Sequence, residues 1–199
     1  MKKIILITFI LFSVHLSYAQ EAERTDKSHY SVTINPAFYA LGGYSVKAYL
    51  HQPKRWSFGI AAEAGFELPE FARDQFFENN DDINVDWDFL WGLEARYRLN
   101  DKAYDEGLYL LGSCGFEGWT VNNEAGTEDE FDNWYASLGI GYLWYPFKKK
   151  NFHLGASYNV VFILNNTEER TVGSSAYNIR SVVPPSLAPN LIIGWRFGN

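Results

Sequence analysis

The stretch that decides the fold is residues 85–99, VDWDFLWGLEARYRL, in which apolar and polar residues alternate. Successive side chains of an extended strand point to opposite faces of a sheet, so one face here is apolar and the other carries most of the charges. The environment of each face decides whether the sheet is soluble or lies in lipid. The apolar face would carry Val85, Trp87, Phe89, Trp91, Leu93, Ala95, Tyr97 and Leu99, and the other face Asp86, Asp88, Glu94, Arg96 and Arg98.

Seven further segments alternate in the same way, whereas helical periodicity is almost absent. Together the eight segments predict an all-β fold, an eight-stranded antiparallel up-and-down transmembrane β-barrel. A soluble up-and-down barrel or a β-sandwich can show the same alternation. The seven segments are about 30–40, 44–51, 56–68, 107–121, 133–146, 152–164 and 186–198.

The connections between these segments alternate in length. Short connections of 51–55, 100–106 and 147–151 are interleaved with long ones of 69–84, 122–132 and 165–185. Only the first hairpin, with its tight turn at Gly42 and Gly43, departs from this order. Short turns on one rim and long loops on the other are typical of outer-membrane barrels.

The polar face is not the face of a solvated strand, because it contains only one lysine, Lys47, and many glycine and serine residues. Small residues mixed with a few large ones suit the narrow interior of an eight-stranded barrel. Buried charges need partners, which predicts a salt-bridged network in the lumen. Its predicted members are Lys47, Glu63, Glu67, Glu94, Arg96, Arg98, Glu117 and Arg196.

Large aromatic residues lie towards the ends of the apolar faces, where they would form girdles at the two lipid interfaces. Trp87 and Tyr97 are ten residues apart, which fits the ~9–11 residues of one tilted membrane strand. A soluble barrel would have to crowd these rings inside. The predicted interface aromatics are Trp56, Trp87, Tyr97, Trp134, Trp144, Phe152, Phe162, Trp195 and Phe197.

The first 19 residues predict a cleavable signal peptide. Lys2 and Lys3 precede an apolar run from Ile4 to Val14, and a small-residue site ends at Ala19. The run is too short to span a bilayer as a mature helix. We therefore expect an exported protein with a short periplasmic segment, 20–29, a barrel domain, 30–199, and a place in the cell outer membrane of a Gram-negative bacterium.

Charge and cysteine content restrict the possible partners and cross-links of the chain. Without Lys2 and Lys3, 15 Lys plus Arg face 24 Asp plus Glu, so nucleic acid is not an expected partner. The single cysteine, Cys114, excludes an intramolecular disulfide and should face lipid. After the signal, no apolar run approaches the ~20 residues of a membrane helix. Any membrane crossing must therefore use strands.

The whole mature chain resembles the small eight-stranded outer-membrane barrels of the OmpX/OmpA transmembrane-domain type, in particular the compact barrels of Bacteroidetes. The resemblance rests on the signal ending SYA, on Ile34-Asn35-Pro36, and on strand ends written Gly-x-x-apolar-x-aromatic, which the outer-membrane assembly machinery reads in the family. The last strand departs from this pattern, because the chain continues past Phe197. The strand ends that fit are Gly92, Ala95 and Tyr97, and Gly139, Tyr142 and Trp144.

Two candidate sites for chemistry are weak. His29, His51 and His153 fall near the short-turn rim, the wrong end for the lipid A acyltransferases and deacylases that share this fold, so we predict no enzyme and no cofactor.

Oxygen-bearing residues recur at every second position of an acidic loop, which suggests a divalent cation site. A hydrated, repulsive outer surface is the alternative. The possible ligands are Asp82, Asn84, Asp86 and Asp88.

The same loop contains the segment PEFARDQFF, residues 69–77. It predicts either a short amphipathic helix with Phe71, Phe76 and Phe77 against lipid or a partner, or a packed loop.

The function predicted from these features is structural or interactive: a plugged barrel that presents acidic loops to lipopolysaccharide, other surfaces or a protein partner. Transport of small or apolar compounds through a narrow barrel is one alternative. A lipid A-modifying enzyme is the other.

Overall fold

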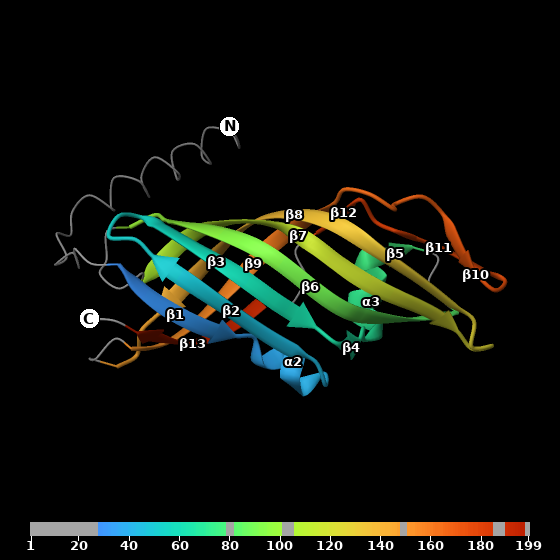
Figure 1. Cartoon of the computed structure of the whole chain (residues 1–199), viewed down its shortest axis with the longest axis horizontal. Coiled ribbons are helices and arrows are strands. Elements are labelled where there is room, and N and C mark those ends of the chain that lie inside the picture. Colours follow the sequence, from blue (N-terminus) through green and yellow to red (C-terminus); the bar gives the residue numbers. More distant parts are fainter. Residues whose placement is uncertain (1–27, 79–81, 101–105, 148–150, 185–189, 198–199) are drawn as a thin grey trace, which may run out of the picture.

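The computed structural model describes residues 28–78, 82–100, 106–147, 151–184 and 190–197. Eight long strands pair antiparallel with their sequence neighbours, and Tyr30 in the first lies opposite Phe197 in the last, which closes the sheet into a barrel (Figure 1). The predicted eight-stranded antiparallel barrel is confirmed. The strands are β1 (His29–Ile34), β2 (Tyr44–His51), β3 (Trp56–Ala64), β6 (Ile83–Arg98), β7 (Gly107–Asn123), β8 (Glu128–Trp144), β9 (Phe152–Ile163) and β13 (Asn190–Phe197).

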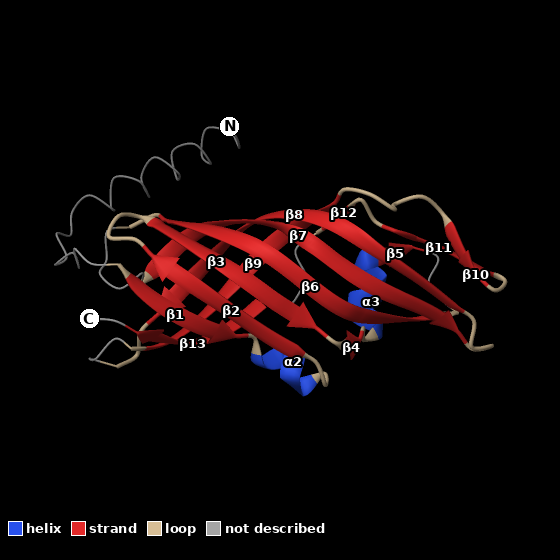
Figure 2. Ribbon diagram, viewed as in Figure 1, coloured by secondary structure: helices blue, strands red, loops and turns tan. Residues whose placement is uncertain are grey.

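Smaller elements fill the connections, and both helices of the described residues are short (Figure 2). No helix among the described residues is long and apolar enough to cross a membrane. The predicted signal peptide and most of the predicted segment 20–29 lie outside the described residues, as do positions 186–189 and 198 of the last predicted strand. The smaller elements are α2 (Pro36–Ala40), β4 (Phe66–Glu67), α3 (Glu70–Phe76), β5 (Phe77–Glu78), β10 (Arg170–Val172), β11 (Ser175–Ile179) and β12 (Val182–Val183).

The first predicted strand, 30–40, is half wrong, because extended structure ends at Ile34 and α2 follows. The Asn35 side chain accepts a hydrogen bond of 3.1 Å from the Ala37 backbone N–H, and Pro36 occupies the first helical turn. Asparagine is a favoured N-cap, and the missing N–H of proline costs nothing at this position. Local capping therefore overrides the alternation.

The barrel wall is uneven in height. β6, β7 and β8 have 16, 17 and 17 residues, whereas β1 and β13 have 6 and 8. In Figure 1 the long strands extend away from the end that carries the C-terminus. The helix α3 and strands β4, β5, β10 and β11 gather towards this far end, which we call the extension.

A β-bulge at Asp88 divides β6 into two parts. The register with β7 shifts between Trp87 and Phe89, so Asp88 is the extra residue. A bulge adds one residue to a strand and so exchanges its two faces beyond that point. Below the bulge Trp91 and Leu93 are exposed, and above it Val85 is fully buried. The single apolar face predicted for residues 85–99 is therefore wrong above Asp88.

The neighbouring strand changes face at the same level. Ala64 and Gly65 both have positive φ angles, 112° and 81°, a conformation that is uncommon for a non-glycine residue such as alanine. Beyond them Phe66 is buried and Glu67 is exposed. Two adjacent strands thus turn their apolar side chains inward together, and the extension gains a core of its own.

This core fills the interior of the extension and includes α3 through Ala72 and Phe76. Phe77 is fully buried, whereas Phe71 is 60% exposed. The segment 69–77 thus forms the predicted short helix, but only Phe71 is free to meet lipid or a partner. The core comprises Ala61, Phe66, Leu68, Phe77, Ile83, Val85, Leu90, Trp119, Val121, Phe131, Tyr135, Ile163, Val172, Tyr177, Ile179 and Val183.

Candidate functional site

Below the apolar core, charged side chains from three adjacent strands point into the interior and contact one another. Lys47 Nζ lies 2.9 Å from Glu63 and 2.7 Å from Glu94, and Arg96 lies 3.5 Å from Glu94. The Tyr49 hydroxyl donates to Glu94 and accepts from Arg96. These groups form one connected network, which satisfies charges that would be costly to bury alone.

The structure places the other predicted network members elsewhere. Glu67 is exposed, so its predicted place in the lumen is wrong, and the cause is the change of face at Ala64 and Gly65. Arg98 donates to the Lys54 backbone carbonyl in the short β2–β3 turn. Arg196 is buried near the ring of Tyr145, and Glu117 is buried on β7, opposite Leu90.

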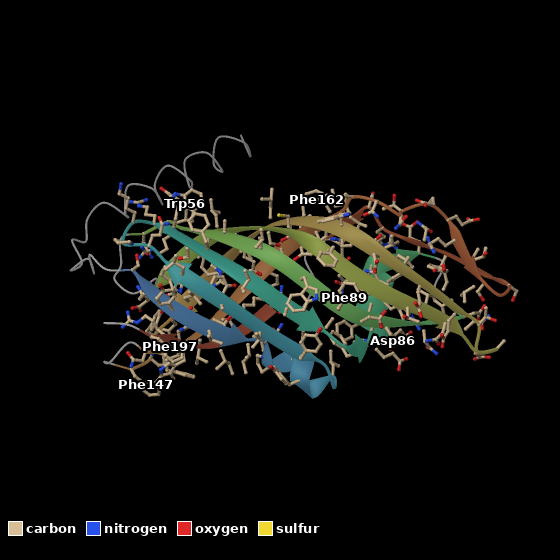
Figure 3. The ribbon with its side chains drawn as sticks, in the orientation of Figure 1. Trp56, Asp86, Phe89, Phe147, Phe162 and Phe197 are labelled. Carbon is tan, nitrogen blue, oxygen red and sulfur yellow. The ribbon has the colours of Figure 1, made fainter. Side chains whose placement is uncertain are left out.

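Eight of the nine predicted interface aromatics lie on the outer face of the barrel. Trp134 and Trp144 are 60% and 49% exposed on β8, and their separation of ten positions spans ~34 Å of strand. At a tilt of ~40° this is ~26 Å in height, close to the ~25 Å apolar band of outer-membrane barrels. In Figure 3 Trp56 and Phe197 lie at the short-turn end and Phe162 lies nearer the middle.

Trp87 is the exception. It packs inside against Phe38, Phe66, Phe76 and Trp119, so its predicted place at the lipid interface is wrong. The bulge at Asp88 turns the ring inward.

Acidic side chains cover the outer face of the extension, where Asp86 is labelled in Figure 3. Asp88 accepts a 2.8 Å hydrogen bond from Thr120, and Asp86 accepts one of 3.4 Å from Asn122. Partial burial raises the pKa of Asp88, and the neighbouring charges of Asp86, Glu130 and Asp132 act in the same direction. This outer face of β6, β7 and β8 above the bulge is called the acidic face below.

The predicted cation ligands are not gathered into a site. Asp82 lies in a turn before β6, and Asn84, Asp86 and Asp88 follow one another along its outer edge. Same-face residues of a strand are ~7 Å apart, too far to surround one ion. Among the residues that the structure describes, no group of three or more His, Cys, Asp or Glu side chains could hold a metal ion.

An ion pair fastens the β10–β11 hairpin to β8. Arg170 donates two hydrogen bonds of 2.8 Å to Asp129, and the Tyr177 hydroxyl donates a third of 2.5 Å. The bonds from Arg170 hold the pKa of Asp129 below its usual value. Burial, followed by the bond to Asp129, raises the pKa of Tyr177. No local pattern indicates this contact, because its partners lie about 40 residues apart in the two long connections predicted at 122–132 and 165–185.

The three histidines lie in the interior at the short-turn end. His51 is 2.7 Å from the Ser31 hydroxyl and 2.8 Å from the Ser57 hydroxyl, and its ring stacks on His29 at 4.6 Å. His153 packs against Tyr145. All three are buried.

A cavity of about 230 Å³ lies between α2, α3 and β9 and reaches the charged network. Its outer part is apolar, and exposed side chains such as Leu41 and Phe71 mark the mouth. Its inner part is polar. The inner lining includes Lys47, Glu63, Glu94, Glu117, Tyr135 and Asn159.

No protein-family model matches the sequence, and no curated protein matches it. Solved structures to which this chain is similar include the N-terminal β-barrel domain of Pseudomonas aeruginosa OprF, with 13% identity and a TM-score of 0.41; the match covers 85% of this chain and 97% of that chain. Neisserial surface protein A has 13% identity, coverages of 85% and 94%, and a TM-score of 0.38. The Yersinia pestis outer membrane protein Ail in a phospholipid bilayer nanodisc has 13% identity, coverages of 86% and 100%, and a TM-score of 0.39.

Proposed function

We propose that this protein is an outer-membrane barrel that presents a rigid acidic surface outside a Gram-negative cell. The observation that carries the proposal is the length of β6, β7 and β8, which have 16, 17 and 17 residues. A tilted strand needs only ~9–11 residues to cross the bilayer. The remainder of each strand forms the extension, which has its own buried core and an outer face of carboxylates in place of aromatic rings.

The orientation follows from the two rims. The short turns and the C-terminal strand end lie on the periplasmic side, and the extension points outward, as in outer-membrane barrels generally. The signal peptide expected in residues 1–19 supports export, and the aromatic rings near both ends of the outer apolar face support a bilayer position.

A structural or interactive role fits the interior better than a general pore. The network around Lys47 and Glu94 occupies part of the lumen, and an eight-stranded barrel is just wide enough for side chains to fill. The buried histidines lie at the end away from the extension, where lipid A does not lie. A non-enzymatic role is therefore the better proposal.

The acidic face limits the choice of partner. Carboxylates repel the phosphates of lipopolysaccharide unless divalent cations bridge them, whereas they attract basic protein surfaces directly. We therefore expect contact with a basic surface of a protein partner, weakened by salt because exposed charges are screened.

Photo-crosslinking in intact cells tests this role. A photo-crosslinking residue in place of Glu130, on the acidic face, should capture a polypeptide. The yield of the crosslinked product should fall when Asp86, Asp88 and Asp132 are each replaced by Asn. The matched control is Leu138, eight residues along the outer face of the same strand, which should contact only lipid. Equal polypeptide capture from both positions, or capture indifferent to neutralisation, would contradict the proposal.

A further inference from the structure

The cavity between α2, α3 and β9 has a two-part lining that suits a two-part ligand. Towards the mouth it is bounded by Phe38, Phe71 and Phe76, and at its inner end by the carboxylates Glu63, Glu94 and Glu117. Ligand pockets in proteins are mostly apolar with a few polar groups that fix orientation. The lining therefore fits a molecule with an apolar body and one polar end.

One carboxyl group at the inner end lies outside the ion pairs. Lys47 binds both Glu63 and Glu94, and Arg96 binds Glu94 from below, so two cations serve two carboxylates. Glu117 is the third carboxylate of the lining and is only 2% exposed. It takes no part in this network and is the carboxyl group of the lining that lies outside these ion pairs.

Glu117 also has an unused acceptor. Its Oε1 atom is buried and has no hydrogen-bond partner among the described residues, and the same is true of Asn159 Oδ1 in the same lining. Burying a polar group without a partner is costly, and the cost is largest for a carboxylate. A donor supplied by a bound molecule would remove this cost.

We propose that the cavity binds a small amphiphilic amine, with its apolar body between α2 and α3 and its ammonium group at Glu117. The volume of about 230 Å³ is below the ~300 Å³ at which ligand pockets usually begin. It therefore admits a compound of one ring and a short chain and excludes a whole lipid. The Lys47 network bounds the inner end of the cavity, so binding does not require a path through the barrel.

The test uses the folded protein in detergent micelles and two probes of equal size, 4-phenylbutylamine and 4-phenylbutyrate. The indole N–H signal of Trp87, which lines the cavity, is followed by NMR and assigned with the Trp87→Phe variant. The amine should shift this signal saturably, and the carboxylate should bind at least about tenfold more weakly, because only the amine can donate a charge-assisted bond to Glu117. Equal binding of the two probes, or no saturable shift with either, would overturn the proposal.

Two variants locate the site. Glu117→Gln keeps the shape of the side chain and should weaken amine binding at least about tenfold, since bonds to charged groups are the stronger ones, whereas Glu124→Gln in the exposed β7–β8 turn should not. Ala72→Trp should fill the mouth and abolish binding while leaving Glu117 intact, with Ala125→Trp as its exposed control. If either cavity variant behaves like its control, the site is not this cavity. Gel mobility before and after boiling reports separately whether the barrel itself has formed.

Discussion

Trp87 and Trp119 lie stacked inside the extension, with ring centroids 5.3 Å apart and an interplanar angle of 6°. They are opposite one another in the β6–β7 ladder, directly above the bulge at Asp88. Without the extra residue, Trp87 would continue the outer face of Trp91 and Leu93. One residue thus separates the part of β6 whose apolar side chains face outward from the part that encloses an apolar core.

Replacing Trp119 by alanine should destabilise the extension strongly. Trp119 is 1% exposed, and truncating a buried tryptophan typically costs ~3–5 kcal/mol. Trp134→Ala, on the outer face, should cost less in the free energy of unfolding because its ring is 60% exposed. Urea unfolding of both variants in the same detergent measures the difference, and equal losses would contradict the assignment of Trp119 to a core.

An arginine on the outer face should report depth in the bilayer. Leu93 lies at mid-strand and is 62% exposed, so Leu93→Arg should cost ~2–4 kcal/mol in lipid, whereas the penalty falls to ~0–1 kcal/mol near an interface. Thr120→Arg, on the outer face of the extension, should be near neutral. The free energy of unfolding in lipid vesicles measures both penalties. Similar penalties for the two variants would contradict the assignment of Leu93 to the bilayer and of Thr120 to the part of the barrel outside it.

Removing the Arg96 guanidinium should leave Glu94 with one cation fewer in the interior. Breaking a buried pair by deleting one partner typically costs ~3–5 kcal/mol, and Arg96 also lies 3.8 Å from the centroid of the Tyr49 ring. Arg96→Met should therefore lower the free energy of unfolding, and the double variant Arg96→Met with Glu94→Gln should recover part of the loss. If the double variant is no more stable than Arg96→Met, the unpaired charge of Glu94 is not the cause of the lost stability.

The β10–β11 hairpin should detach in acid. The pKa of Asp129 is lowered in the folded state from 3.8, so its contribution to stability is present above that value and is lost as the pH falls through the lower folded pKa. Hydrogen exchange of residues 170–179 should therefore accelerate below about pH 4, the ordinary range of an aspartate. Asp129→Asn should abolish this pH dependence and Asp132→Asn should leave it intact; the reverse pattern would assign it to another group.

The alternation in the sequence predicted the barrel because the barrel strands below the bulge have one apolar and one polar side, and β2 has the predicted bounds 44–51. It missed the bulge, although the run Phe89-Leu90-Trp91 breaks the alternation there. The small strands of the extension depend on distant partners, as in the pairing of Ile179 with Phe77, and local pattern carries no information on such contacts. The cavity was missed for the same reason, since α2, α3 and β9 meet only in the folded chain.

The most direct test of the barrel in lipid uses Cys114, the single cysteine of the chain. It is exposed and lies opposite Leu93 in the β6–β7 ladder. A spin label on Cys114 in lipid vesicles should be relaxed strongly by oxygen, which concentrates in the bilayer, and weakly by a water-soluble nickel chelate. A label at position 132, placed by Asp132→Cys in a Cys114→Ala background, should show the opposite order. Stronger relaxation of the Cys114 label by the nickel chelate than by oxygen would contradict the account.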